Sequence, residues 1–180
     1  MIRIISGTHR GRRIRAPRKL PVRPTTDRAK EALFNILAAE MDWPRAHVLD
    51  LYAGTGNISY ESASRGGETI TAVDADAGCV AFIRKTAAEL NMPIHAVRSD
   101  CLAYLRQSAL KFDLVFGDPP YDMNPGELEE LVQEVMDRQL LAPEGLLILE
   151  HTRETDLSHL DAFEQARRYG GTVFSFFRGI

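Results

Sequence analysis

The chain of 180 residues is 44% hydrophobic and 26% charged, a balance typical of soluble globular proteins that excludes disordered, collagen-like and membrane classes. A chain of this size buries enough surface to fold without a disulfide or a structural metal. Its two cysteines, Cys79 and Cys101, form no CxxC pair, and no apolar run is long enough for a membrane helix or a signal peptide. We therefore expect a cytoplasmic protein.

The formal net charge of −3 hides a strong asymmetry along the chain. Residues 1–30 contain ten Lys and Arg but one acid, Asp27, whereas the remainder contains 12 basic and 24 acidic residues. A basic arm on an acidic body is typical of proteins that bind a polyanion, most often a nucleic acid. The alternative interpretation is a solvated terminus without a partner.

The N-terminal segment predicts a two-stranded ribbon. Ile2, Ile4 and Ile14 are interleaved with arginines, with glycines between them, so residues 2–15 are expected to pair with a basic face outward. An isolated hairpin is marginally stable, and we therefore expect it to dock on the rest of the protein or on its ligand.

Three prolines rule out a continuous helix through residues 16–24. Thr25 or Thr26 can then cap a helix whose apolar face continues to about Met41. A domain boundary is expected near residues 42–46.

From residue 46 onward, short apolar runs alternate with helical stretches. Strands are expected at 47–52, 69–73, 94–98, 112–116 and 146–150, with helices at about 57–65, 77–91, 101–109 and 125–138. This alternation predicts an α/β fold with a parallel sheet covered on both faces. The last segment, 163–178, predicts a hairpin that turns on Gly170 and Gly171.

Four aspartates stand where predicted strands end: Asp50, Asp74, Asp100 and Asp118. Ligands of open α/β sheets bind beside the carboxyl ends of the strands, so these side chains are expected to line one crevice. Crowded carboxylates favour a ligand that carries positive charge. Each aspartate could instead cap the helix that follows it, and Asp76 is a better cap than Asp74.

The first of these aspartates opens a glycine turn, Asp50-Leu51-Tyr52-Ala53-Gly54-Thr55-Gly56. The glycines let the backbone approach a ligand closely. The turn resembles the dinucleotide fingerprint, but Ser59 replaces its third small residue and Asp50 would repel a pyrophosphate. Asp74 follows Gly56 by 18 residues, near the spacing of an acid that binds ribose. A cationic, ribose-containing ligand without phosphate fits this pattern, and S-adenosylmethionine has that chemistry.

Asp118-Pro119-Pro120-Tyr121 predicts a rigid turn of hydrogen-bond acceptors, since its two prolines lack backbone donors. The Asp118 carboxylate and the Pro119 carbonyl can accept both hydrogens of an exocyclic amine, and Tyr121 offers a ring on which a base can stack. Such an arrangement would catalyse transfer by positioning and electrostatics. Because a base inside a duplex cannot reach the turn, the target is expected to be single-stranded or flipped out.

Together, these segments closely resemble the RsmD family, bacterial methyltransferases that modify the N2 amine of a guanine in small-subunit (16S) rRNA. The resemblance is carried by Ile4-Ile5-Ser6-Gly7, Arg10-Gly11-Arg12, Arg23-Pro24-Thr25-Thr26-Asp27-Arg28, Glu31-Ala32-Leu33-Phe34-Asn35, Leu49 to Gly56, Ser64-Arg65-Gly66, Asp118 to Tyr121 and the terminal Tyr169-Gly170-Gly171-Thr172. The four-residue turn alone is shared with DNA adenine-N6 enzymes, whereas the stretch from Arg23 to Arg28 is more particular.

The resemblance implies a class I methyltransferase (Rossmann-like) fold, with a seven-stranded sheet whose last strand is antiparallel. Residues 1–42 would form a basic RNA-binding hairpin and helix, and residues 43–180 the S-adenosylmethionine-dependent domain. The implied cofactor residues are Asp50, Tyr52, Gly54, Gly56, Asp74, Ala75, Asp100 and Cys101. The implied catalytic residues are Asp118, Pro119, Pro120 and Tyr121, and the residues expected to bind RNA phosphates are Arg10, Arg12, Arg13 and Arg23.

Two departures from the family pattern are visible. Asp74 stands where relatives often carry Glu, and Asn57-Ile58-Ser59-Tyr60 stands where smaller residues are common. The five histidines are scattered without metal-ligand spacing, and no metal is expected.

Two other functions stay open from the sequence. One is a DNA adenine-N6 methyltransferase, although 180 residues leave little room for a base-reading domain. The other is a non-catalytic RNA-binding protein on a methyltransferase scaffold. For either methyltransferase, the substrate would be nucleic acid, and for the leading hypothesis it would be small-subunit rRNA or a ribosomal assembly intermediate.

Overall fold

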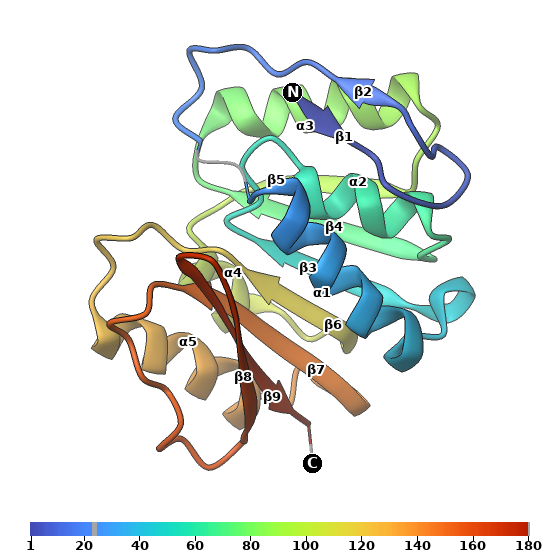
Figure 1. Ribbon diagram of the computed structural model, residues 1–180. Helices are drawn as coiled ribbons and strands as arrows, with labels where there is room; N and C mark the ends of the chain where they lie inside the picture. The colour runs from blue at the N-terminus through green and yellow to red at the C-terminus, as the bar shows by residue number, and fades with distance from the viewer. Residues whose placement is uncertain (23–24, 180) are drawn as a thin grey trace.

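The computed structural model describes residues 1–22 and 25–179, which form a central sheet with helices on both faces (Figure 1). The strands of the sheet are β3 (His47–Leu51), β4 (Thr69–Asp74), β5 (Ile94–Arg98), β6 (Phe112–Gly117), β7 (Leu141–His151), β8 (Phe163–Tyr169) and β9 (Thr172–Arg178). The helices are α1 (Asp27–Glu40), α2 (Asn57–Ser64), α3 (Ala77–Glu89), α4 (Cys101–Gln107) and α5 (Pro125–Asp137), with a short 3-10 helix, η1 (Trp43–Arg45), before β3.

The strand order is β5-β4-β3-β6-β7-β9-β8. Strands β3 to β7 pair in parallel, and β9 is antiparallel to both of its neighbours. The chain runs outward from β3 to β5 and then returns to the other side of β3 at β6, so the strand order reverses between β3 and β6. Such a reversal opens a crevice at the carboxyl edge of the sheet. The α/β architecture and the antiparallel last strand confirm the expected fold.

Successive residues of the central strands face two separate apolar clusters. In β3, Val48 packs in the cluster that includes α1, α2 and α3, whereas Leu49 packs in the cluster that includes α4 and α5. In β6, Phe116 belongs to the first cluster and Val115 to the second. Because both faces of the sheet are buried, its strands are nearly continuous apolar runs, which made them recognisable in the sequence.

The N-terminal arm, residues 1–22, docks on the C-terminal end of α2. Its paired strands, β1 (Ile2–Arg3) and β2 (Arg13–Ile14), are shorter than the expected ribbon because the segment between them bonds to α2 instead. The amide of Thr8 donates to the carbonyl of Ser64 over 2.8 Å. Gly7 has a φ of +91°, and a Cβ there would lie 1.8 Å from the Ser64 carbonyl oxygen. This close approach requires glycine.

The predicted helix and strand ends mostly lie within two residues of the observed ends, and Thr26 caps α1 as one of the two proposed caps. Strand β7 is the exception, since it begins at Leu141 instead of residue 146. Its register shifts before Leu146, and Glu144 has a φ of +63°. Pro143 lacks a backbone donor, so this irregular start has the sequence of a turn.

Side chains from both sides of the expected boundary near residues 42–46 pack in one apolar cluster. Phe34 of α1 stacks on Trp43 with ring centroids 5.9 Å apart, and Phe34 lies in the same cluster as Val48. The division into residues 1–42 and 43–180 stays a prediction. Within residues 1–22 and 25–179, none of the helices combines the length and the apolar character needed to cross a lipid bilayer.

Candidate active site

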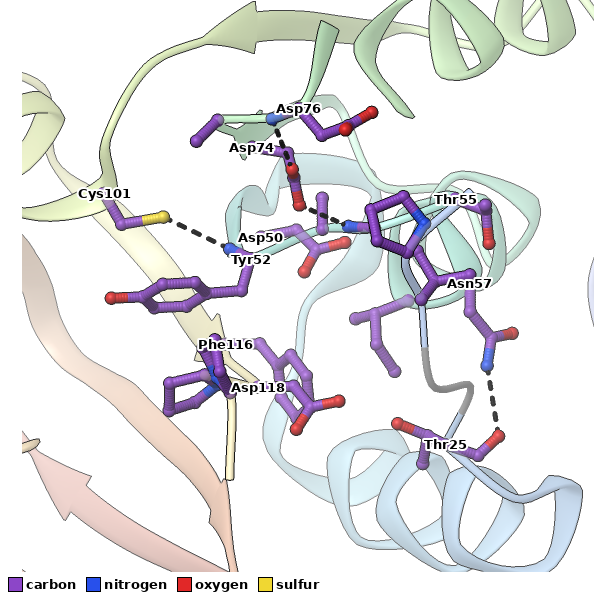
Figure 2. A pocket seen from close by; sticks show the side chains of 18 of the residues that line it. Thr25, Asp50, Tyr52, Thr55, Asn57, Asp74, Asp76, Cys101, Phe116 and Asp118 are labelled. Carbon is purple, nitrogen blue, oxygen red and sulfur yellow. Dashed lines mark hydrogen bonds between the residues drawn. The ribbon is translucent and has the colours of Figure 1, made fainter. Parts of the chain in front are cut away.

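A pocket of about 470 Å³ lies at the carboxyl edge of the sheet, where the strand order reverses. All four strand-end aspartates line it: Asp50, Asp74, Asp100 and Asp118. Figure 2 shows Asp50, Asp74 and Asp118 around the pocket. They come from β3, from the end of β4, from the residue before α4 and from the residue after β6. The volume is within the usual range for small-molecule sites. The sequence therefore predicted correctly that these side chains meet, while their roles stay predictions.

Asp50 forms the buried floor of this pocket, and its side chain accepts a hydrogen bond of 2.7 Å from the Ser59 hydroxyl of α2. Burial raises the pKa of Asp50 to about 7, against the opposing effect of the Ser59 hydrogen bonds. Ser59 therefore stands where a dinucleotide fingerprint has a small residue, and here it donates a hydrogen bond to Asp50. A cationic ligand would favour the ionised form of Asp50.

Asp74 connects the glycine turn to the start of α3. Its Oδ2 accepts from the amide of Gly54 and its Oδ1 from the amide of Asp76, each over 2.9 Å (Figure 2). Each carboxylate oxygen retains capacity for a further hydrogen bond, such as one from a ribose hydroxyl. Asp76 accepts from the amide of Cys79 and caps α3, as the sequence predicted. Ala75, between the two acids, also lines the pocket.

Asp100 serves as a helix cap and as part of the pocket wall. It is exposed, and its side chain accepts from the amide of Ala103 over 2.9 Å, so the capping interpretation holds for this residue as well. The buried Cys101 beside it accepts a hydrogen bond from the amide of Tyr52, with 3.3 Å between nitrogen and sulfur. Burial raises the pKa of the Cys101 thiol to about 12, so this residue is a neutral wall of the pocket.

The glycine turn takes a backbone path that other residues would strain. Gly56 has a φ of +95°, and a Cβ there would lie 2.6 Å from the ring of Tyr60. Gly54 has a φ of +58°, and a Cβ there would lie 3.1 Å from the side chain of Val22, which belongs to the arm. Helix α2 begins directly after the turn, so the turn and the helix are built as one unit.

The residues Asp118 to Tyr121 follow β6 and line the pocket, and Asp118 lies across it from Asp74 (Figure 2). Pro119 is buried, whereas Tyr121 is 53% exposed. The carbonyl of Pro120 accepts from the amide of Met123 over 3.0 Å, which closes the turn. The ring of Tyr121 is thereby presented at the mouth of the pocket.

The arm also supplies part of the pocket wall, which the sequence did not predict. Pro21 and Val22 of the arm line the pocket, as do Thr25, which lies between the arm and α1, and Asn57 and Ile58 of α2. The one sequence feature that could have indicated this placement is the proline-interrupted stretch 16–24. It excludes a helix and therefore favours an extended path over another part of the protein.

A buried ion pair joins α1 to α2 beneath this wall. Lys30 Nζ lies 3.4 Å from Glu61 Oε1, and both side chains are 0% exposed. Lys30 also donates to Asn57 Oδ1 over 2.8 Å and to the carbonyl of Arg3. Glu61 accepts from the amides of Ile5 and Ser6. Burial lowers the pKa of Lys30, an effect that Glu61 opposes.

The predicted RNA-binding arginines divide into two groups. Arg10, Arg12 and Arg13 are exposed on the arm, and their guanidinium groups form no hydrogen bond or ion pair with the described part of the chain. Arg23 lies outside the described residues. Across residues 1–22 and 25–179, no group of three or more His, Cys, Asp or Glu side chains is arranged to hold a metal ion.

Comparisons with known proteins agree with this geometry. The family model described as Conserved hypothetical protein 95 matches residues 2–178. Ribosomal RNA small subunit methyltransferase D from Escherichia coli is 35% identical over 162 residues, which cover 89% of this chain and 80% of that protein. YlbH from Bacillus subtilis is 34% identical over 87% of this chain and 85% of its own length.

Solved structures show the same fold. The structure of yhhF from Escherichia coli has a TM-score of 0.84 and 31% identity, and covers 99% of this chain and 97% of that one. The 16S rRNA N2 G1207 methyltransferase of Thermus thermophilus, solved with AdoMet and guanosine, has a TM-score of 0.70 and 21% identity over 89% of this chain and 45% of its own. The fold is therefore that of the class I methyltransferases. By its sequence match over nearly the whole chain, the protein belongs to the Conserved hypothetical protein 95 family, the RsmD family.

Proposed function

We propose that the protein transfers a methyl group from S-adenosylmethionine to the N2 amine of a guanine in small-subunit rRNA. The observation that carries this function is the juxtaposition, in one pocket, of four aspartates with the turn from Asp118 to Tyr121. Membership in the RsmD family supports the rRNA substrate, because the relatives that match most of this chain are named as rRNA methyltransferases.

The residues of the pocket fit the cofactor on the chemistry of its donors and acceptors. Asp50 would favour the cationic methionine portion, Asp74 would accept from the ribose hydroxyls, and Asp100 with Cys101 would flank the adenine. Gly54 of the glycine turn lines the same pocket, so the backbone there can approach a ligand without a Cβ between them. When bound, S-adenosylmethionine supplies an electrophilic methyl carbon.

The protein's own contribution to the reaction would be to hold the amine. Asp118 and the carbonyl of Pro119 would accept its two hydrogens, which directs the nitrogen lone pair toward the methyl carbon. Tyr121 would stack on the base, and its exposed ring supports this role. Methyl transfer would leave S-adenosylhomocysteine, which keeps the electrons of the carbon–sulfur bond, and the guanine nitrogen would release one of its two protons to solvent. The residues of the turn would contribute by positioning and electrostatics.

The arm would hold the RNA while the base enters the pocket. Exposed Arg10, Arg12 and Arg13 offer charge to phosphates, which position a nucleic acid without specifying its sequence. Arg23 is proposed for the same role from the resemblance alone. This substrate, together with the free, buried Cys79 and Cys101, supports a cytoplasmic location.

Methyl transfer from labelled S-adenosylmethionine tests the proposal. Small ribosomal subunits and rRNA from a strain that lacks this gene are incubated with the enzyme, and the labelled nucleoside is identified by digestion and mass spectrometry. We expect N2-methylguanosine at one position of the small-subunit rRNA. Label on adenine, or preference for duplex DNA over rRNA, would support the DNA adenine-N6 alternative instead. Absence of cofactor binding at millimolar concentration would support the non-catalytic alternative.

A further inference from the structure

Thr25 lines the same pocket as Asp118 and Tyr121, although it is not one of the site residues predicted from the sequence. It lies between the arm and α1. Its hydroxyl points into the part of the pocket toward which the Asp118 carboxylate also points (Figure 2). Because both residues line this pocket, a base whose amine lies at Asp118 can direct the ring atom next to that amine toward Thr25.

The position of Thr25 is fixed by hydrogen bonds on two sides. Its hydroxyl donates to Glu150 Oε2 at the end of β7 over 2.8 Å. Its carbonyl accepts from Asn57 Nδ2 over 3.4 Å, and Asn57 is itself held by the buried Lys30. A side chain held in this way can discriminate between ligands, because it cannot turn to suit another one.

The bond to Glu150 also fixes the polarity of the hydroxyl. The hydroxyl of Thr25 is the donor in this bond, so its single proton lies on the Glu150 side. Thr172 directs its hydroxyl to the other oxygen of the same carboxylate over 3.4 Å. What Thr25 presents to the pocket is therefore a pair of acceptor sites.

We propose that Thr25 determines base specificity by accepting the N1 hydrogen of the target guanine. This inference rests on the proposed function, which places the N2 amine at Asp118. Guanine carries a hydrogen on N1 next to that amine, whereas N1 of adenine and of 2-aminopurine is an acceptor. A site built to accept a hydrogen rejects a base that lacks it, because the acceptor and the base nitrogen then face each other unpaired.

The test compares two rRNA substrates that carry either guanine or 2-aminopurine at the mapped methylation position. Both are prepared in the form that the wild-type enzyme methylates, which is free RNA or reconstituted small subunits. The base 2-aminopurine retains the amine at C2 but has no N1 hydrogen. The quantity compared is the ratio of kcat/KM on guanine to kcat/KM on 2-aminopurine. The variants are Thr25→Val, which keeps the side-chain shape without the hydroxyl, and Thr25→Ser, which keeps the hydroxyl.

Thr172→Val is the matched control, because it removes the other hydroxyl that donates to Glu150 and does not line the pocket. We expect Thr25→Val to lower the guanine preference about tenfold by slowing the guanine substrate alone. Thr25→Ser and Thr172→Val are expected to keep the wild-type ratio.

An equal loss on both bases in Thr25→Val, an unchanged ratio, or the same change of ratio in Thr172→Val would overturn the inference. Analysis of the wild-type product separates this failure from that of the proposed function. If wild type forms N2-methylguanosine but the ratios do not shift, only the role of Thr25 is wrong. If wild type forms no N2-methylguanosine, the proposed function itself is wrong.

Discussion

The pocket and the N-terminal arm are both fixed through their backbone amides, but they present opposite charges to a ligand. In the pocket, acidic side chains hold the backbone, as Asp74 does when it accepts from the amides of Gly54 and Asp76. In the arm, backbone groups are held by Ser64 and Glu61 of α2, while the side chains of Arg10 and Arg12 are exposed. The pocket is thus shaped in advance for one small ligand. The arm offers charge that can follow a phosphate backbone, whose contacts depend on charge more than on shape.

Helix α2 connects these two regions. It begins after the glycine turn at the pocket and ends at Ser64, on which the arm docks. Glu61 on the same helix accepts from the arm backbone and pairs with Lys30, which in turn holds Asn57 at the pocket. The two regions can therefore be separated by mutation only at their outer residues, and changes to the shared network are expected to disturb both.

The largest effect is expected from Asp118→Ala, which removes the acceptor proposed for the target amine and leaves the other three aspartates in place. Turnover should fall by about 100-fold or more, the usual cost of losing one electrostatic contact in the transition state. Cofactor affinity should change little. Single-turnover methylation and calorimetry with S-adenosylhomocysteine measure the two effects separately, and an active variant would contradict the role of Asp118.

Lys30→Met should disturb both regions at once. It leaves the buried Glu61 with Arg65 as its remaining charged partner, so the loss should stay below the roughly 3 kcal/mol that removing a sole partner of a buried charge costs. Urea unfolding should show this loss, accompanied by weaker RNA and cofactor binding. Lys85→Met is the matched control, because its pair with Glu89 is exposed and contributes little. Equal stability of the two variants would show that the buried pair is not what joins the regions.

Replacing Arg12 and Arg13 by Gln should affect the arm alone. Loss of two phosphate contacts should weaken rRNA binding and lower the slope of log K against log salt by about 1.5. Cofactor binding should be unchanged. Arg138→Gln at the end of α5 provides a control, since it removes one exposed charge far along the chain from the arm. A double variant with an unchanged salt slope would remove both arginines from the RNA interface.

A change of pH should alter cofactor affinity through Asp50 in the pocket, without an effect on the arm. The pKa of Asp50 in the free protein is raised to about 7 by burial, and a bound cation would favour the ionised form. Affinity should therefore be constant above pH 7 and fall by up to about tenfold per pH unit below it, as binding releases a proton. Calorimetry in two buffers of different ionisation enthalpy measures this release. Asp50→Asn should bind more weakly and without this dependence, and a flat wild-type profile would contradict the assignment.

The raised pKa of Asp50 also makes the stability of the ligand-free protein depend on pH. Because the folded protein binds the Asp50 proton more tightly than the unfolded chain does, stability without ligand should decrease as the pH rises from about 4 toward 7. Asp50→Asn should remove this decrease and make the ligand-free protein more stable at pH 8. Thermal unfolding across this pH range would reveal it, and a variant less stable than wild type at pH 8 would argue against a raised pKa.

Much of the architecture was predictable because its signals are local. The apolar runs that form β3 and β6 and the aspartates at their ends give the sheet and its crevice from the sequence alone, and Gly170 marks the final turn. The start of β7 was not predictable, because Pro143 and Glu144 have the sequence of a turn.

The residues missed at the site depend on the path of the chain in three dimensions. Thr25 and Val22 reach the pocket because the arm docks on α2, and nothing in their own sequence neighbourhood records that docking. Lys30 looks like an exposed helix residue, yet it is fully enclosed because Glu61 and the Arg3 carbonyl surround it. Long-range contacts of this kind override local pattern.

The central claim is that the aspartate-lined pocket holds S-adenosylmethionine with its methyl group directed at the turn from Asp118 to Tyr121. A crystal structure of the protein with S-adenosylmethionine tests it most directly. The account predicts ribose hydroxyls at Asp74, adenine beside Asp100 and Cys101, and the methyl carbon facing Asp118. An adenosyl group bound at any other surface, or a methyl group directed away from that turn, would contradict it.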